Sequence, residues 1–244
     1  MLYIDFGNTL IKIGYFLNSN LIIEKLEVKL LNFDSLKEKI VQIKNKINIK
    51  SIIISSVKPE KNIILSQVFD FLKIKYKFIS YLDFNENDLT FNKKITKEEV
   101  GNDILLAAYY IGQKYKSGYV VSLGTALVLS KTENKKIIGV SIMPGIKKGL
   151  NALFDNTSLV KQIKLNKDIK NIGYNTSDAV SSGVQFRILS LIMYLNYINK
   201  QNYKIIFTGG DLSYFNKEIF NNIEEEIVVK SLILFTNNKL KESI

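Results

Sequence analysis

Three short glycine turns, each placed directly after an apolar run, are the part of this sequence best suited to chemistry. They are residues 5–12 (DFGNTLIK), 123–126 (LGTA) and 208–211 (TGGD). Glycine lets the backbone come close to phosphate oxygens, and Thr or Asn side chains add hydrogen-bond donors. A strand that ends in a tight glycine turn, found three times, favours a phosphotransferase.

Two carboxylates stand where such a reaction needs them. Asp5 ends a predicted buried strand, where it could hold a hydrated Mg²⁺ next to phosphate, and Lys12 could add positive charge. Asp103 lies in a Gly-Asn-Asp segment at a predicted helix start and could act as general base for a substrate hydroxyl. Each pattern also has a purely structural interpretation, a hairpin turn for Gly7-Asn8 and a helix N-terminus for Asp103.

Composition narrows the chemistry further. The 244 residues include no Cys and no His, which excludes thiolate or imidazole catalysis, so any general base must be Asp, Glu, Lys or Tyr. The net charge of +11 would attract anions, but Arg187 is the only Arg and the lysines are scattered. We therefore expect no nucleic-acid partner.

The hydropathy pattern predicts a protein without membrane segments. No apolar stretch reaches the roughly 18 residues that a membrane helix needs. The N-terminus shows no basic region followed by an apolar one, so no signal peptide is expected. A cytoplasmic location is the expectation.

The spacing of apolar residues predicts an α/β fold with a repeated plan. Expected strands are 2–4, 12–16, 21–30, 51–55, 76–79, 119–123, 126–130, 136–142, 205–208 and 227–229. Expected helices are 35–47, 60–72, 98–114, 145–154, 178–200, 213–220 and 231–240. Because each half starts with a three-strand meander, we expect domains at 1–116 and 117–244 with a nucleotide cleft between them.

In their order along the chain, the motifs resemble those of the type III pantothenate kinases of the ASKHA superfamily (acetate and sugar kinases, heat-shock chaperones, actin). The residues that carry the resemblance are 5–12, 55–59, 101–103, 124–126, 144–145 with 152–153, 175–176 with Gly183, and 208–211. The resemblance implies a duplicated ribonuclease-H-like (actin-like ATPase) fold and a homodimer. It also implies ATP-dependent phosphorylation of pantothenate to 4′-phosphopantothenate, the first step of coenzyme A biosynthesis, with Mg²⁺ and K⁺ or NH₄⁺.

The resemblance also implies roles for individual residues. Asp103 would be the general base. Metal binding would fall to Asp5 and, more weakly, Ser122. Phosphate and nucleotide contacts would come from Asp5, Gly7, Asn8, Thr9, Lys12, Gly124, Thr125, Gly209 and Gly210. The pantothenate pocket would include Gly101, Asn102 and Thr176, with Thr176 reaching across the dimer.

Several positions depart from the family pattern. Ile104 stands where an Arg for the pantothenate carboxylate is usual, and Ser122 stands where an Asp is usual. Further departures are Val128, Ser130, Lys94 and Lys97. Two hypotheses follow: a divergent active pantothenate kinase, or a nucleotide-binding or regulatory homologue of the same fold. A kinase for another small hydroxylated substrate is a variant of the second.

Overall fold

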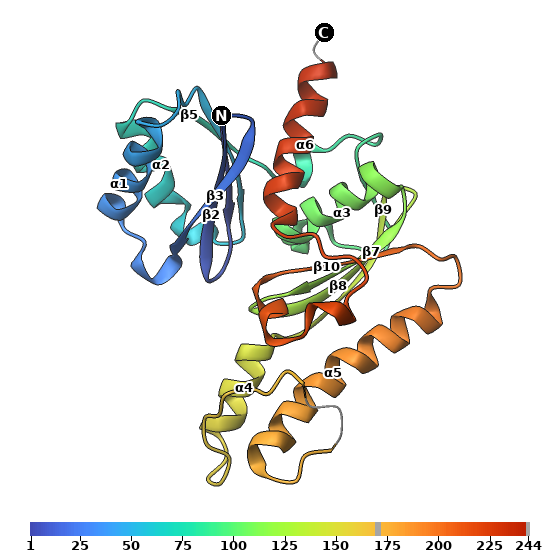
Figure 1. The fold of residues 1–244 in the computed structure, drawn as a ribbon. Coiled ribbons are helices and arrows are strands. Elements are labelled where there is room, and N and C mark those ends of the chain that lie inside the picture. Colours follow the sequence, from blue (N-terminus) through green and yellow to red (C-terminus); the bar gives the residue numbers. More distant parts are fainter. Residues whose placement is uncertain (169–171, 243–244) are drawn as a thin grey trace. The chain divides into compact units, whose positions relative to one another are not determined.

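The computed structural model describes residues 1–168 and 172–242, and the chain forms two compact units (Figure 1). The first unit comprises residues 1–114, 135–137 and 226–244, and the second comprises 115–134 and 138–225.

The first unit contains a mixed sheet in the order β3-β2-β1-β4-β5. Its strands are β1 (Leu2–Phe6), β2 (Leu10–Leu17), β3 (Asn20–Glu27), β4 (Ser51–Ser56) and β5 (Lys75–Phe78). The first three strands pair antiparallel, while β4 and β5 join in parallel. Side chains alternate between the faces of a strand, so Leu2, Ile4 and Phe6 share one face of β1. They pack there in one apolar core with α1 (Phe33–Lys44) and α2 (Asn62–Phe71).

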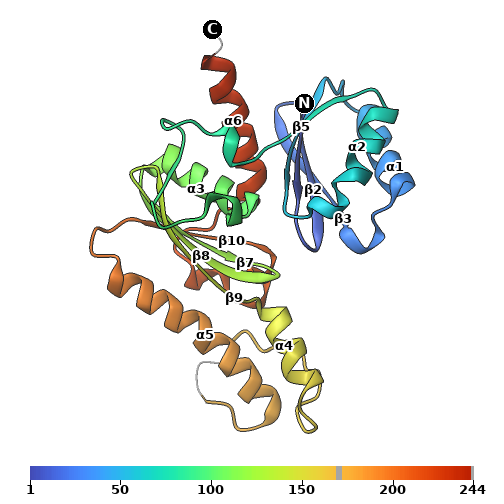
Figure 2. The ribbon, with the colours of Figure 1, turned by 180° about the vertical axis from the view of Figure 1, so that it is seen from behind.

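The other side of the first sheet faces α6 (Ile227–Glu242). This helix contacts β1, β2 and β4, and it lies away from α1 and α2 in both ribbon views (Figures 1 and 2). Gly14 on β2 makes the approach possible, because a Cβ at that position would overlap Val229. The helix is also joined to α3 (Asn102–Tyr115), since Ser231 Oγ donates to the Leu106 carbonyl at 2.6 Å. The C-terminal helix therefore belongs to the first unit.

The second sheet has the order β10-β7-β8-β9-β6. Its strands are β6 (Thr90–Phe91), β7 (Gly118–Leu123), β8 (Ala126–Glu133), β9 (Lys136–Pro144) and β10 (Lys204–Thr208). β7 pairs antiparallel with β8 and parallel with β10. The helices of the second unit are α4 (Ile146–Asp155) and α5 (Thr176–Ile198). Short 3-10 helices lie at Val28–Leu30, Pro59–Lys61, Tyr81–Asp83, Lys97–Glu99, Gly210–Tyr214 and Lys217–Ile219.

Three sequence-based predictions of local structure were wrong. Residues 227–229 were expected as a strand but form the first turn of α6, because this β-branched run is buried on a helix, with Val229 fully inaccessible. Residues 213–220 were expected as a helix but hold the two separate 3-10 helices Gly210–Tyr214 and Lys217–Ile219. The helix expected from residue 98 begins at Asn102, after a separate 3-10 helix.

The compact units divide the chain differently from the predicted domains 1–116 and 117–244. The largest difference is the segment after residue 225, which the packing of α6 on the first sheet assigns to the first unit. The predicted domain boundaries remain a prediction about the duplicated halves.

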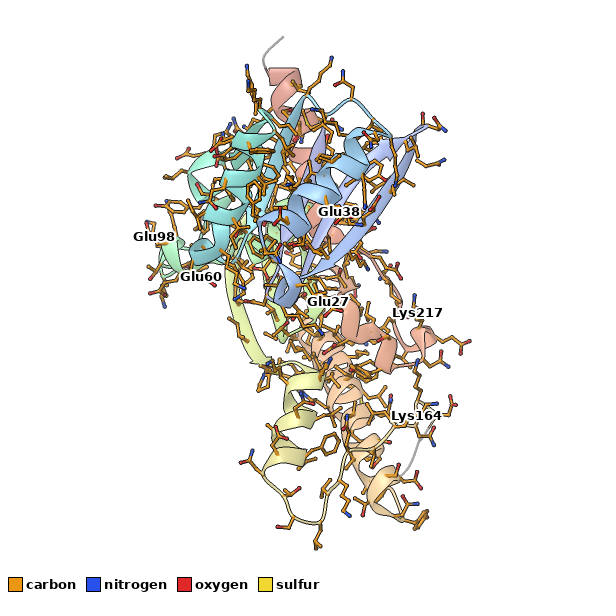
Figure 3. All side chains as sticks on the ribbon, turned by 90° about the vertical axis from the view of Figure 1, so that its left-hand side faces the viewer. Glu27, Glu38, Glu60, Glu98, Lys164 and Lys217 are labelled. Carbon is orange, nitrogen blue, oxygen red and sulfur yellow. The ribbon has the colours of Figure 1, made fainter. Side chains whose placement is uncertain are left out.

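Charged side chains lie on the outside of both units. Glu27, Glu38 and Glu60 extend outward from the first unit, and Lys164 and Lys217 from the second (Figure 3). Within residues 1–168 and 172–242, no helix has the length and hydrophobicity required to cross a membrane.

Candidate active site

Four polar side chains form a row across the first sheet. Lys25, Lys12, Asp5 and Ser55 occupy matching positions on β3, β2, β1 and β4. Register partners on neighbouring strands project from the same face, so all four lie opposite the core shared with α1 and α2. Asp5 and Ser55 are only 7% and 1% exposed. The row places a buried carboxylate between a lysine and a hydroxyl.

Glu226 fixes the lysines of this row. Lys12 Nζ lies 2.7 Å from Glu226 Oε2 and 3.7 Å from Asp5 Oδ2, and Lys25 Nζ lies 2.8 Å from Glu226 Oε1. Burial lowers the pKa of Lys12, but the carboxylates of Asp5 and Glu226 outweigh it and raise the pKa overall. Burial likewise raises the pKa of Glu226, but the two lysines outweigh it and lower the pKa overall. Lys12 therefore stays charged beside Asp5.

Lys12 only partly offsets the cost of burying the charge of Asp5. Burial raises its pKa to about 6; Lys12 opposes the rise, and the negative charges of Asp103 and Glu226 add to it. Next to it in register, the buried Ser55 Oγ has no hydrogen-bond partner within the part of the chain that the structure describes. Carboxylate and hydroxyl oxygens are donors that a hard cation such as Mg²⁺ accepts.

A cation bound at Asp5 would need ligands from outside the protein. Among the described residues, no group of three or more Asp, Glu, His or Cys side chains could enclose a metal ion. Mg²⁺ is commonly held by one or two carboxylates together with water and substrate phosphates. The donor set at Asp5 fits that mode of binding.

Asp103 lies in the first turn of α3, close to the end of β4. Ile104 N donates to Asp103 Oδ1 at 2.9 Å, and burial raises the pKa of the Asp103 carboxyl despite this bond. A Cβ on Gly101 would lie 2.8 Å from Asp103 Oδ1, so glycine leaves room for the carboxylate. Asn102 Nδ2 donates to the Ser56 carbonyl at 3.0 Å and ties the helix start to β4. The helix start and strand end together hold Asp103 within electrostatic range of Asp5.

The turn between β1 and β2 is closed by backbone bonds and presents its side chains outward. Gly7 N donates to the Leu10 carbonyl at 3.0 Å, and the Thr9 carbonyl accepts from Val28 N at 2.9 Å. The side chains of Asn8 and Thr9 are exposed. The turn therefore closes the hairpin through its backbone and leaves its polar side chains accessible.

In the second unit, three glycine-containing turns pack together. Gly145, just before α4, donates its N–H to the Thr125 carbonyl at 3.1 Å, and a Cβ there would overlap the Gly124 carbonyl oxygen. Gly209, just after β10, has φ +106°, and a Cβ there would overlap the Leu123 carbonyl oxygen. Only glycine fits at 145 and 209, so the backbones of these turns meet directly.

Asp211 connects the third turn to α4. Its Oδ2 accepts from Ile146 N at 3.1 Å and from Lys147 N at 3.5 Å, at the helix N-terminus. Burial raises the pKa of Asp211, and these two N–H groups oppose the rise. The roles of Asp211 and Glu226 were not expected from sequence. The Thr-Gly-Gly-Asp motif offered a signal for Asp211, whereas Glu226 belongs to an acidic run, 224–226, typical of a solvated surface.

The second sheet has a row corresponding to that of Asp5, without charge. Ser122 stands two residues before Gly124, as Asp5 stands two residues before Gly7. Its register partners are Thr208 on β10 and Val128 on β8. The carboxylate suited to a divalent cation is thus on the first sheet, and a metal contact of Ser122 remains a prediction.

Thr176 is the first residue of α5, away from these turns in sequence. Asn175 caps the helix by accepting from Asp178 N at 2.9 Å, which confirms the predicted helix start. Thr176 is exposed and lines a cavity of about 900 Å³ between α4 and α5. The sequence-predicted site residues thus fall into three groups: the Asp5 row with Asp103, the glycine turns of the second unit, and Thr176.

Comparison with known proteins decides the family. A family model described as type III pantothenate kinase matches residues 1–197. The chain belongs to the type III pantothenate kinase family. A type III pantothenate kinase of Pelagibacter ubique is 31% identical over 95% of this chain and 96% of its own. That of Mycoplasma mobile is 30% identical over 86% of this chain and 87% of its own.

Solved structures support the fold of this pantothenate kinase family member. A Baf family protein of Campylobacter jejuni has a TM-score of 0.63 at 17% identity, covering 99% of this chain and 100% of its own. A protein of Sinorhizobium meliloti described as a 2-dehydro-3-deoxygalactonokinase has a TM-score of 0.59 at 10% identity, covering 97% and 98%. At these identities the likeness shows the fold alone, and it confirms the predicted fold class.

Proposed function

We propose that this protein transfers the γ-phosphoryl group of ATP to the 4′-hydroxyl of pantothenate, giving 4′-phosphopantothenate for coenzyme A biosynthesis. Family membership supports the substrates. The observation that supports the chemistry is the buried Asp5, flanked by Lys12 and Ser55 and influenced by the charge of Asp103. Phosphoryl transfer needs positioning, charge neutralisation and a base for the hydroxyl, and these residues offer all three.

Asp103 is the proposed general base. It would accept the proton of the pantothenate hydroxyl as the oxygen attacks the γ-phosphorus. Burial raises its pKa, and a carboxylate with a raised pKa is a better proton acceptor than an exposed one. Gly101 and Asn102 position it, one by leaving space and the other by its bond to β4.

Asp5, with Ser55 beside it, is the proposed site for Mg²⁺, whose charge would neutralise the ATP phosphates. Asn8 and Thr9 would donate hydrogen bonds to phosphate oxygens, with Gly7 allowing their approach, and Lys12 would add a fixed positive charge. In the second unit, the turns with Gly124, Thr125, Gly209 and Gly210 would contact phosphate and nucleotide. We also propose that a monovalent cation (K⁺ or NH₄⁺) binds near Ser122. The protein would act as a homodimer that brings Thr176 to the pantothenate pocket, and it would be located in the cytoplasm.

The test is direct detection of 4′-phosphopantothenate by mass spectrometry, with purified protein, ATP, Mg²⁺, K⁺ and pantothenate. Asp103→Asn should abolish turnover and leave ATP binding nearly intact. Asp34→Asn is the matched control, because Asp34 occupies the same first-turn position in α1 but is exposed and pairs with Lys37. It should retain wild-type activity.

Three outcomes are distinguishable. Product formed by wild type but not by Asp103→Asn supports both the reaction and the base. Equal turnover in Asp103→Asn would remove this residue from the mechanism. Absence of product from the wild type, with ATP still bound, would favour a nucleotide-binding homologue or a kinase of another hydroxylated substrate. The replacements at Ile104 and Ser122 would then explain the loss of activity on pantothenate.

A further inference from the structure

Arg187 on α5 is the only arginine among the 34 lysine and arginine residues of the chain. Its Nη2 donates to the carbonyl of Pro144, which opens the β9–α4 junction (residues 144–147). Its charge also acts on the carboxyl of Asp211, in the third glycine turn. A guanidinium group presents five donors in a rigid planar fork, whereas a lysine ammonium is a point charge on a flexible stem. The single arginine therefore stands where one side chain acts on a backbone carbonyl and on a carboxylate.

The β9–α4 junction is held from two sides. Pro144 accepts a hydrogen bond from Arg187 on α5. Asp211 Oδ2 accepts from Ile146 N at 3.1 Å and, more weakly, from Lys147 N at 3.5 Å. Burial raises the pKa of Asp211, and the two N–H groups together with the charges of Lys147 and Arg187 oppose this rise. Arg187 therefore bonds one end of the junction directly and helps to keep the acceptor at the other end ionised.

Gly145, between these two anchors, packs directly on the second glycine turn. Gly145 N donates to the Thr125 carbonyl at 3.1 Å, and a Cβ on Gly145 would overlap the Gly124 carbonyl oxygen. The contact joins backbone to backbone, so a shift of the junction would move the Gly124-Thr125 turn or break the contact. In the proposed function this turn contacts the phosphates of ATP. All of these residues belong to the second unit.

We propose that Arg187 is a positioning residue for ATP binding, because it holds the β9–α4 junction and, through it, the Gly124-Thr125 turn in the conformation that receives phosphate. This inference rests on the proposed kinase function. The physical reason is preorganisation, since a turn that is already ordered loses less entropy when a ligand binds. Without Arg187, part of the free energy of ATP binding would be used to order the junction. The affinity for ATP would fall, while the chemical step, in which Arg187 takes no part, would keep its rate.

The experiment measures kcat, KM for ATP and KM for pantothenate in variants of Arg187. Arg187→Gln should raise KM for ATP about tenfold, the lower end of the range for one hydrogen bond from a charged donor. It should leave kcat and KM for pantothenate unchanged. Arg187→Lys keeps the charge and a donor but loses the planar fork, so it should recover part of the loss.

The matched control is Lys148→Gln, which removes an equal charge from an exposed position on α4 and should leave KM for ATP unchanged. Calorimetry measures the affinity of every variant for ATP, and the thermal midpoint and native mass check its fold. A purely structural role of Arg187 would lower the amount of folded enzyme. The apparent kcat would then fall, and KM for ATP would stay the same.

A second variant, Asp211→Asn, tests the other anchor of the junction. It keeps an oxygen that can accept from Ile146 N but loses the charge on which Arg187 acts. Because both side chains hold the same junction, the effects of Arg187→Gln and Asp211→Asn should not be additive. The double variant should raise KM for ATP by less than the product of the two single effects. An increase equal to that product would overturn the joint action of the two residues.

The outcomes separate this inference from the proposed function. Unchanged KM and affinity for ATP in Arg187→Gln would overturn the inference and leave the kinase reaction intact. An increase beyond about 200-fold would exceed one hydrogen bond and would overturn it in favour of direct contact with ATP. If the wild type binds ATP but forms no product, calorimetry decides: weaker ATP binding in Arg187→Gln than in Lys148→Gln supports the inference, and equal binding refutes it. A wild type that binds no ATP would refute both proposals.

Discussion

Glu226→Gln is the substitution that most directly tests the charge network of the first unit. Glu226 lies 2.7 Å from Lys12 and 2.8 Å from Lys25. The substitution keeps the shape and an acceptor oxygen but removes the negative charge from both pairs. Lys12 is then left buried with Asp5 as its remaining counter-charge, at 3.7 Å.

The expected magnitude follows from burial. The side chains of Lys12 and Glu226 are 22% and 16% exposed, so both charges are largely removed from water. Removing one partner from a buried pair costs about 3 to 5 kcal/mol. Partial exposure and the retained amide oxygen reduce this to about 2 kcal/mol. Lys25 is half exposed and adds little, because exposed pairs contribute about 0 to 1 kcal/mol.

The assay is urea unfolding followed by circular dichroism, with the adjacent Glu225→Gln as control. Glu225 pairs with Lys217 at 2.8 Å, but both side chains are more than 60% exposed, so its loss should cost under about 0.5 kcal/mol. For a chain of this size, the Glu226→Gln loss corresponds to a melting midpoint lower by about 4 to 8 °C. Under the proposed function, KM for ATP should also rise, because Lys12 is no longer fixed.

Two results would refute the reasoning. One is an equal, small change in unfolding free energy for Glu226→Gln and Glu225→Gln. The other is strict additivity of Glu226→Gln with Lys12→Met in a double-mutant cycle, since residues in one ion pair should show a coupling of about 0.5 to 3 kcal/mol.

Two further predictions concern the glycine turn after β10 and the titration of Asp5. Gly209→Ala should lower the melting temperature markedly, because Gly209 has φ +106° and a Cβ there would overlap the Leu123 carbonyl. Gly210→Ala should change the melting temperature little, because a Cβ at Gly210 would enter open space. Equal effects of the two substitutions would contradict this packing. Asp5 has a pKa of about 6 in the folded protein, against an ordinary value of 3.8. Between these two pH values the folded, metal-free protein therefore binds more protons at Asp5 than the unfolded chain does. The free energy of unfolding should consequently fall as pH rises from about 4 to about 6. Asp5→Asn should abolish this loss in melting curves recorded with a chelator, and an unchanged pH dependence would show that Asp5 does not titrate in this range.

The sequence was informative where a local pattern fixes local geometry. Apolar alternation and the Gly7-Asn8 turn define the β1–β2 hairpin, and the pairing of Asp5 with Lys12 follows from that hairpin. The capping residue Asn175 marks the start of α5. The order of the motifs along the chain was sufficient to indicate the family, because they span most of its length.

Local patterns failed where burial by distant segments overrides propensity. Ile227, Val228 and Val229 are β-branched and predict a strand, yet they form a helix that covers the first sheet. The two-residue strand β6 is too short for any periodicity, and it exists because residues 136–137 pair with it. The cavity between α4 and α5 likewise depends on how these two helices pack, which no spacing within either helix reveals.

The acidic run 224–226 shows the division between local and tertiary information most clearly. Local sequence shows that three carboxylates lie in succession, and it predicts that Asp5 lies at the end of a buried strand. Only the docking of α6 on the sheet decides that Glu226 turns inward to the lysines of β2 and β3 while Glu225 pairs at the surface. The physical reason is that the energy of a charge depends on its burial and its partners, and both are set here by residues far apart along the chain, Lys12 and Glu226.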